Sequence, residues 1–141
     1  MAAVGPIGVG ASAEITRGGS DGFWDNDGNL YLNGGGATPL FNPGSGGYSN
    51  FLAATGFDFS ALPDGAVIDG IEVVWTLQDI FNSGEFADES SYLTKDGSAS
   101  VGSNLATSTT VPGSSTPYTY GGSSSLWDTS WTAAEIKSSN F

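Results

Sequence analysis

The sequence predicts an all-β protein of one domain, built from short antiparallel strands joined by many turns. Gly, Ser and Thr account for 54 of its 141 residues, and 17 residues are aromatic, a composition that favours turn-rich β-structure over long helices. Exposed faces of long helices need Lys and Arg, of which the chain has three. Candidate strands recur at a spacing of roughly 8–12 residues, which indicates a sandwich or a barrel.

The N-terminal half contains three predicted strands. We expect an early edge strand at 13–16, a short strand at 30–32 and a longer strand at 50–59. Phe51, Ala53, Thr55, Phe57 and Phe59 are expected to share one face of this strand. Gly56 interrupts this strand and predicts a bulge or a close approach of another backbone.

The clearest strand signal is the segment 67–80, which follows a Pro-Asp-Gly turn at 63–65. Its polar and apolar residues alternate with a period of two, as in a half-buried strand. The residues expected on the buried face are Ile71, Val73, Trp75 and Leu77.

The C-terminal part predicts a hairpin, one further strand and one helix. The hairpin covers 91–102 and turns at Lys-Asp-Gly, and a Ser/Thr-rich loop then leads to a strand at 118–120. Thr132 and Glu135 have the spacing of a capping box, which predicts a short C-terminal helix from Ala133 to about residue 138.

Composition excludes several functions. Without His or Cys, the chain cannot form a Ser-His-Asp or Cys-His catalytic site, a Cys/His zinc site or a disulfide. The net charge of −12 makes contact with nucleic acid or an anionic membrane surface unfavourable. No apolar run approaches the roughly 18 residues of a membrane span, and the N-terminal segment lacks the pattern of a secretory signal.

Acidic clusters offer candidate cation sites, but neither cluster follows a known pattern. The first lacks the Gly and Glu positions of a calcium-binding EF-hand loop, so solvated turn residues are the favoured interpretation. The second is interpreted as an exposed acidic rim. No pair of carboxylates is marked as catalytic, so we expect no enzyme activity, no cofactor and no metal. The two clusters are Asp21, Asp25 and Asp27, and Asp79, Glu85, Asp88 and Glu89.

Four tryptophans could stack on sugars or pack in the core, and core packing is the favoured interpretation. Trp75 lies on the buried face of its strand, and Trp127 and Trp131 flank the turn that enters the helix. Trp24, beside Phe23, is the one most open to an exposed role.

The order and spacing of several blocks resemble a pattern in bacteriophage virion structural proteins. The resemblance covers about 21–141 and implies a single jelly-roll β-sandwich on the outside of a phage particle or tail, with no catalytic residue. Similar sequences continue past Asn140-Phe141 into further strands, so either the sequence is partial or a neighbouring subunit lends a strand. The blocks are 49–52, 55–59, 63–66, 68–73, 93–97, 101–104, 118–122, 126–127 and 131–132.

The resemblance implies a non-enzymatic virion protein, and within that class we expect a capsid decoration (cement) protein that stabilises the outer shell. Residues 1–12 would form a flexible docking arm before a sandwich domain at 13–141. Leu, Ile, Val and Phe make up only 21% of the chain, so stability is expected to be shared with neighbouring subunits.

The expected partners are capsid or tail proteins and further copies of the chain, with a trimer implied by the resemblance. The alternatives are a tail, neck or fibre component, a carbohydrate-binding or adhesion module, and an extracellular filament subunit. The residues expected at interfaces are Val4, Ile7, Val9, Trp24, Tyr118, Tyr120 and Phe141.

Overall fold

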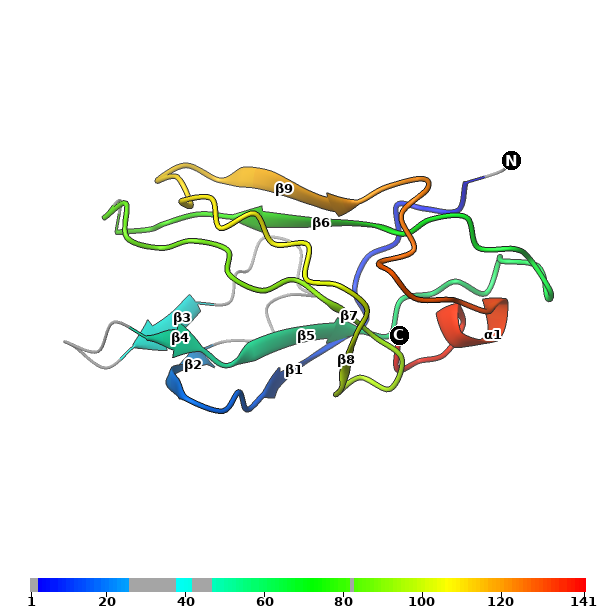
Figure 1. Ribbon diagram of the computed structural model, residues 1–141, viewed down its shortest axis with the longest axis horizontal. Coiled ribbons are helices and arrows are strands. Elements are labelled where there is room, and N and C mark those ends of the chain that lie inside the picture. The colour runs from blue at the N-terminus through cyan, green and yellow to red at the C-terminus, as the bar shows by residue number, and fades with distance from the viewer. Residues whose placement is uncertain (1–2, 26–37, 42–46, 82) are drawn as a thin grey trace. The chain divides into compact units, whose positions relative to one another are not determined.

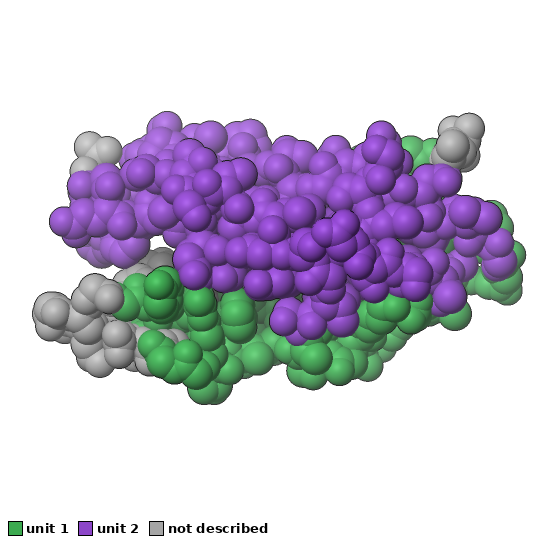
Figure 2. Space-filling model, viewed as in Figure 1, with its two compact units in different colours: residues 1–64, 94–99, 134–141 green, residues 65–93, 100–133 purple. Residues whose placement is uncertain are grey.

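A computed structural model describes residues 3–25, 38–41, 47–81 and 83–141 (Figure 1). Within these residues the chain forms nine short strands and one four-residue helix, which confirms the all-β prediction. The strands pair in sheets of two or three. The chain divides into two compact units, coloured separately in Figure 2. Unit 1 comprises 1–64, 94–99 and 134–141, and unit 2 comprises 65–93 and 100–133.

The first sheet of unit 1 pairs β1 (Ala11–Ile15) with β5 (Phe51–Thr55) in antiparallel register. The predicted edge strand at 13–16 is therefore present, but it begins at Ala11, so residues 11 and 12 belong to a strand and not to the predicted arm. Where this sheet ends, two glycines allow the backbones of the two segments to approach closely. A Cβ at Gly10 would collide with the carbonyl oxygen of Gly56, which confirms the close approach predicted there.

Strand β5 ends at Thr55, four residues earlier than predicted. Gly56 adopts a φ of 70°, in the left-handed region, and its N–H donates to the carbonyl oxygen of Phe141 at 3.1 Å. The chain turns away from the sheet there, and Phe57 and Phe59 then pack against the Phe141 ring, at centroid distances of 6.2 and 5.8 Å. The residues predicted to form the end of this strand therefore contact a residue that is distant in the sequence, and they do not pair in the sheet.

The second sheet of unit 1 is mixed. Strand β2 (Ser20–Asp25) pairs antiparallel with β3 (Thr38–Phe41) and parallel with β4 (Tyr48–Ser49). The strand predicted at 30–32 lies outside the described residues.

Unit 2 is built on the antiparallel pair β6 (Glu72–Leu77) and β9 (Thr116–Gly121), which lie side by side in Figure 1. Burial alternates along β6 with a period of two, as predicted, and Val73, Trp75 and Leu77 lie on the more buried face. The strand is shorter than the predicted 67–80. On its N-terminal side, a Cβ at Gly70 would collide with the backbone of 122–124, so the chain packs there without ladder pairing.

The predicted hairpin is present as β7 (Leu93–Thr94) and β8 (Ser100–Val101). The Asp96 carboxylate braces its turn by accepting the N–H groups of Ala99 and Ser98, each at 2.8 Å. These hydrogen bonds lower the pKa of Asp96 to about 2, because they favour its charged form.

The predicted C-terminal helix is present as α1 (Ala133–Ile136), two residues shorter than expected. Ahead of it, Trp127 and Trp131 are buried, as predicted. Trp127 is only 2% exposed, and its indole N–H donates to the carbonyl oxygen of Ile71 at 3.1 Å. Gly102 and Gly121 lie against it, and a Cβ on Gly102 would collide with the Trp127 carbonyl oxygen.

Candidate interaction surface

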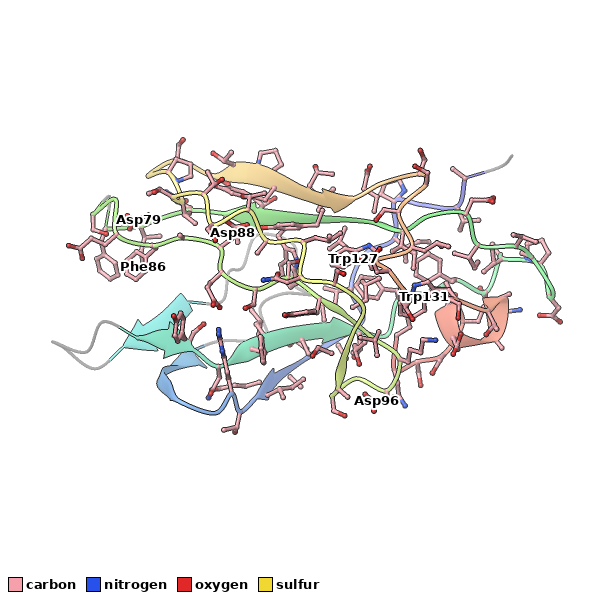
Figure 3. The ribbon with its side chains drawn as sticks, viewed as in Figure 1. Asp79, Phe86, Asp88, Asp96, Trp127 and Trp131 are labelled. Carbon is pink, nitrogen blue, oxygen red and sulfur yellow. The ribbon has the colours of Figure 1, made fainter. Side chains whose placement is uncertain are left out.

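An apolar loop tip follows β6 in unit 2. We call residues 79–81 and 83–86 the Asp79 loop; Figure 3 labels Asp79 and Phe86 at its two ends. The Asp79 N–H donates to the carbonyl oxygen of Pro112 at 2.8 Å, and the Val111 N–H donates to the carbonyl oxygen of Phe86 at 2.8 Å. Both ends of the loop are therefore fixed to the same neighbouring segment.

The carboxylate of Asp79 organises the interior of this loop. Asp79 is 3% exposed and accepts hydrogen bonds from the N–H of Gly84 at 2.9 Å and the N–H of Phe81 at 3.0 Å. The Ser83 hydroxyl donates a third at 3.0 Å. Burial tends to raise the pKa of Asp79, but the hydrogen bonds outweigh it, so the pKa lies below its ordinary value. The carboxylate is thus ionised at neutral pH and keeps all three donors engaged.

The loop presents two large apolar side chains to solvent. Ile80 is 60% exposed and Phe81 is 69% exposed, although Asp79 beside them is buried. Single exposed apolar residues are ordinary on protein surfaces. Two adjacent ones on a loop that is fixed at its base and braced inside form a small, preordered apolar tip.

Charge is distributed unevenly between the two units. Unit 2 contains no Lys or Arg, so the tip belongs to a part of the chain whose formal charges are all negative. The carboxylates of unit 2 are Asp69, Glu72, Asp79, Glu85, Asp88, Glu89 and Asp128.

All three cations belong to unit 1, and each has a partner there. The Arg17 guanidinium lies 4.3 Å from the centroid of the Tyr48 ring. Lys95 pairs with Glu135 at 2.8 Å, and Lys137 pairs with Asp64 at 2.6 Å. The hydrogen bond and charge of Lys137 lower the pKa of Asp64.

The second acidic cluster is only partly the exposed rim that the sequence predicts. Asp88 is an internal acceptor like Asp79: it takes the N–H of Thr109 at 2.7 Å, the N–H of Thr107 at 2.9 Å and the hydroxyl of Tyr120 at 3.1 Å. Burial and the Asp88 charge raise the pKa of Tyr120. Glu85 and Glu89 are exposed, as expected of a rim.

The described residues contain no group of three or more acidic, His or Cys side chains placed to hold a metal. Of the first acidic cluster, Asp27 lies outside the described residues, and Asp21 and Asp25 lie in β2, where the side chains are outside the description as well.

A concavity of about 370 Å³ lies beside Trp127 in unit 2. Trp127 and Asp128 both have positive φ angles, of 58° and 53°, and the Asp128 carboxylate accepts the Ser103 hydroxyl. Because the Trp127 side chain is buried, its ring face is not available for a sugar to stack on. The lining residues are Leu105, Ser124, Ser125, Leu126, Trp127, Asp128 and Thr129.

The predicted interface residues are spread over both units. Val4 is exposed, and Ile7, Val9 and Tyr118 are half-buried, so an interface role for these four stays a prediction. Trp24 lies in β2, but its side chain is outside the description.

Tyr120 and Phe141 are buried within the chain, and an interface role for these two also stays a prediction. Tyr120 is held there by its hydrogen bond to Asp88, and Phe141 by its packing against Phe57 and Phe59.

The apolar tip itself was missed from the sequence. Ile80 and Phe81 follow β6 after the polar residues Gln78 and Asp79, and the Asn-Ser-Gly sequence at 82–84 is a turn signal directly after them. That turn signal indicates that the chain changes direction after the two residues, but it does not indicate that their side chains reach solvent.

Comparisons with protein-family models, curated proteins and solved structures found no match for this chain. No helix among the described residues has the length and hydropathy needed to cross a membrane.

Proposed function

We propose that this chain is a non-enzymatic structural protein of a bacteriophage particle, most specifically a capsid decoration protein that stabilises the outer shell. In this proposal the strands of the chain form a jelly-roll sandwich, as the sequence resemblance implies. The chain acts by binding other proteins in many copies, and it carries out no chemical reaction.

The observation that carries the proposal is the charge of unit 2. Seven carboxylates without a single Lys or Arg repel nucleic acid, and they suit a surface that faces solvent and other proteins. A decoration protein needs that combination, because it lies on the side of the shell away from the packaged DNA.

Binding energy would come from small patches repeated over many copies. The Asp79 loop supplies one exposed apolar patch. Residues 3–10 supply a second candidate, because they form no strand and Val4 is exposed. An arm of this kind, rich in Gly and Ala, can follow the backbone of a neighbouring subunit closely.

The test is a binding experiment with phage capsid shells. Purified protein is added to emptied, expanded shells that lack it, and bound copies are counted by imaging and by quantitative gel analysis. We expect saturation at a fixed number of copies per shell, at defined positions, and greater resistance of the shells to heat. Failure to bind shells under all conditions would overturn the capsid assignment.

A tail, neck or fibre component is the second candidate, favoured by the same residues 3–10, which form no strand and fit an oligomeric adaptor equally well. The position of the protein in an intact particle, seen by imaging, separates the two. A carbohydrate-binding role would instead predict binding to a glycan array that is lost in Trp24→Ala.

A further inference from the structure

We propose that Ile80 and Phe81 form a docking pair that inserts into an apolar pocket, rimmed by Lys and Arg, on a partner protein. The inference rests on the proposed function in one respect: it takes the partner to be a protein of the phage particle. It goes further by naming the residues that dock and the chemistry of the surface that receives them.

Preorganisation is the first argument. The Asp79 N–H is bonded to Pro112, and the buried Asp79 carboxylate accepts the N–H of Phe81, so little backbone entropy of 79–81 remains to be lost on binding. Aromatic side chains that fill a pocket often dominate the energy of an interface. Phe81, at 69% exposed, has most of its surface available for this.

Charge is the second argument, and it selects the partner. Glu85 is exposed close to the tip in sequence, and unit 2 itself contains no Lys or Arg. A second copy that presents the same tip would face the pair with the same negative charges, and like charges facing each other oppose association. A pocket with a basic rim complements the tip, so self-association of this chain would use another surface.

The experiment compares Phe81→Ala with Val67→Ser. Val67 is the matched control, because it is an apolar residue of unit 2 that is even more exposed, at 82%. Both proteins, with the wild type, are titrated onto purified capsid shells and, separately, onto purified tails from the same phage. Circular dichroism and thermal melting check that each variant is folded. Both variants are expected to fold, because both replaced side chains are exposed.

We expect Phe81→Ala to weaken binding at least about 30-fold, the loss typical of a central aromatic at an interface, and Val67→Ser to weaken it less than about threefold. Raising NaCl from 0.05 to 0.5 M should slow association of the wild type markedly, and Glu85→Gln should reduce that salt dependence.

The outcomes separate the two proposals. Binding to shells that Phe81→Ala leaves unchanged overturns the docking pair and keeps the decoration function. Binding only to tails, lost in Phe81→Ala, keeps the docking pair and overturns the capsid assignment. Absence of binding to shells and tails alike overturns both.

Two further measurements address other occupants of the tip. Wild-type binding to phosphatidylcholine vesicles that is lost in Phe81→Ala would assign the pair to a lipid surface and overturn the inference. A shift of oligomeric state in Phe81→Ala, seen by analytical ultracentrifugation, would assign it to a second copy and overturn the inference as well.

Discussion

Replacing Trp127 with Ala should lower the free energy of unfolding by about 3–5 kcal/mol, the range for large aromatic residues removed from a core. The side chain is 2% exposed, so nearly all of its contacts are lost. The upper part of the range is expected, because the indole ring lies against Gly121, which has no side chain to fill the space left by the ring. A chain of this length is stable by roughly 7–20 kcal/mol, so the loss is a large fraction of the total.

Trp127→Phe retains much of the packing and removes the hydrogen bond. It keeps a ring in the site and removes the indole N–H that donates to Ile71. The Ile71 carbonyl also accepts the N–H of Gly122 at 3.0 Å, so it stays bonded in the variant. We therefore expect a loss of only about 1–2 kcal/mol.

The assay is urea unfolding followed by far-UV circular dichroism, because the substitution itself changes tryptophan fluorescence. Tyr92→Ala, at a partly exposed aromatic position of the same unit, is the control and should cost less than about 1 kcal/mol. A Trp127→Ala variant within about 1 kcal/mol of the wild type would refute the argument. Equal losses for Trp127→Ala and Trp127→Phe would refute the part that separates packing from the hydrogen bond.

Three further predictions concern single side chains. Gly102→Ala should destabilise by at least about 2 kcal/mol in the same urea assay, because the residue has a φ of 76° and its new Cβ would meet the Trp127 carbonyl; an unchanged midpoint would contradict this. Asp96 has a pKa of about 2 when folded and about 3.9 when unfolded, so its stabilising effect is complete above about pH 5 and is lost progressively as pH falls from there through 2. An NMR titration of its carboxyl carbon should show the low midpoint, and an ordinary midpoint would count against the braced turn. Tyr120→Phe should cost about 1 kcal/mol through the lost bond to Asp88, and in the wild type one phenol should stay protonated above pH 10 in an absorbance titration.

Features set by neighbouring residues could be predicted from the sequence. The alternation in β6 follows from period-two patterning. The hairpin at 91–102 follows from Lys-Asp-Gly, in which Asp96 accepts N–H groups two and three residues later. The helix begins at Ala133, directly after the predicted cap residue.

Features set by distant residues could not be predicted in the same way. Strand β5 stops before Gly56 because the N–H of Gly56 donates to the carbonyl oxygen of Phe141, 85 positions later in the sequence. Phe141 is buried at this contact.

The candidate site shows the same limit. In the sequence, Asp79 resembles the other acidic residues around it. Only the three-dimensional structure of the loop shows that Asp79 is buried while its apolar neighbours Ile80 and Phe81 are exposed. The polarity of Asp79, Ile80 and Phe81 predicts the opposite arrangement.

The placement of all cations in unit 1 has a practical consequence for labelling and proteolysis. Trypsin cuts after Lys or Arg, so no site exists within 65–93 or 100–133, and a trypsin-resistant core would say nothing about whether unit 2 is folded. A Glu-specific protease would report on unit 2 through Glu72, Glu85 and Glu89. Dyes that react with lysine amines attach at Lys95 and Lys137, so a labelled protein keeps every side chain of the Asp79 loop unmodified for binding measurements.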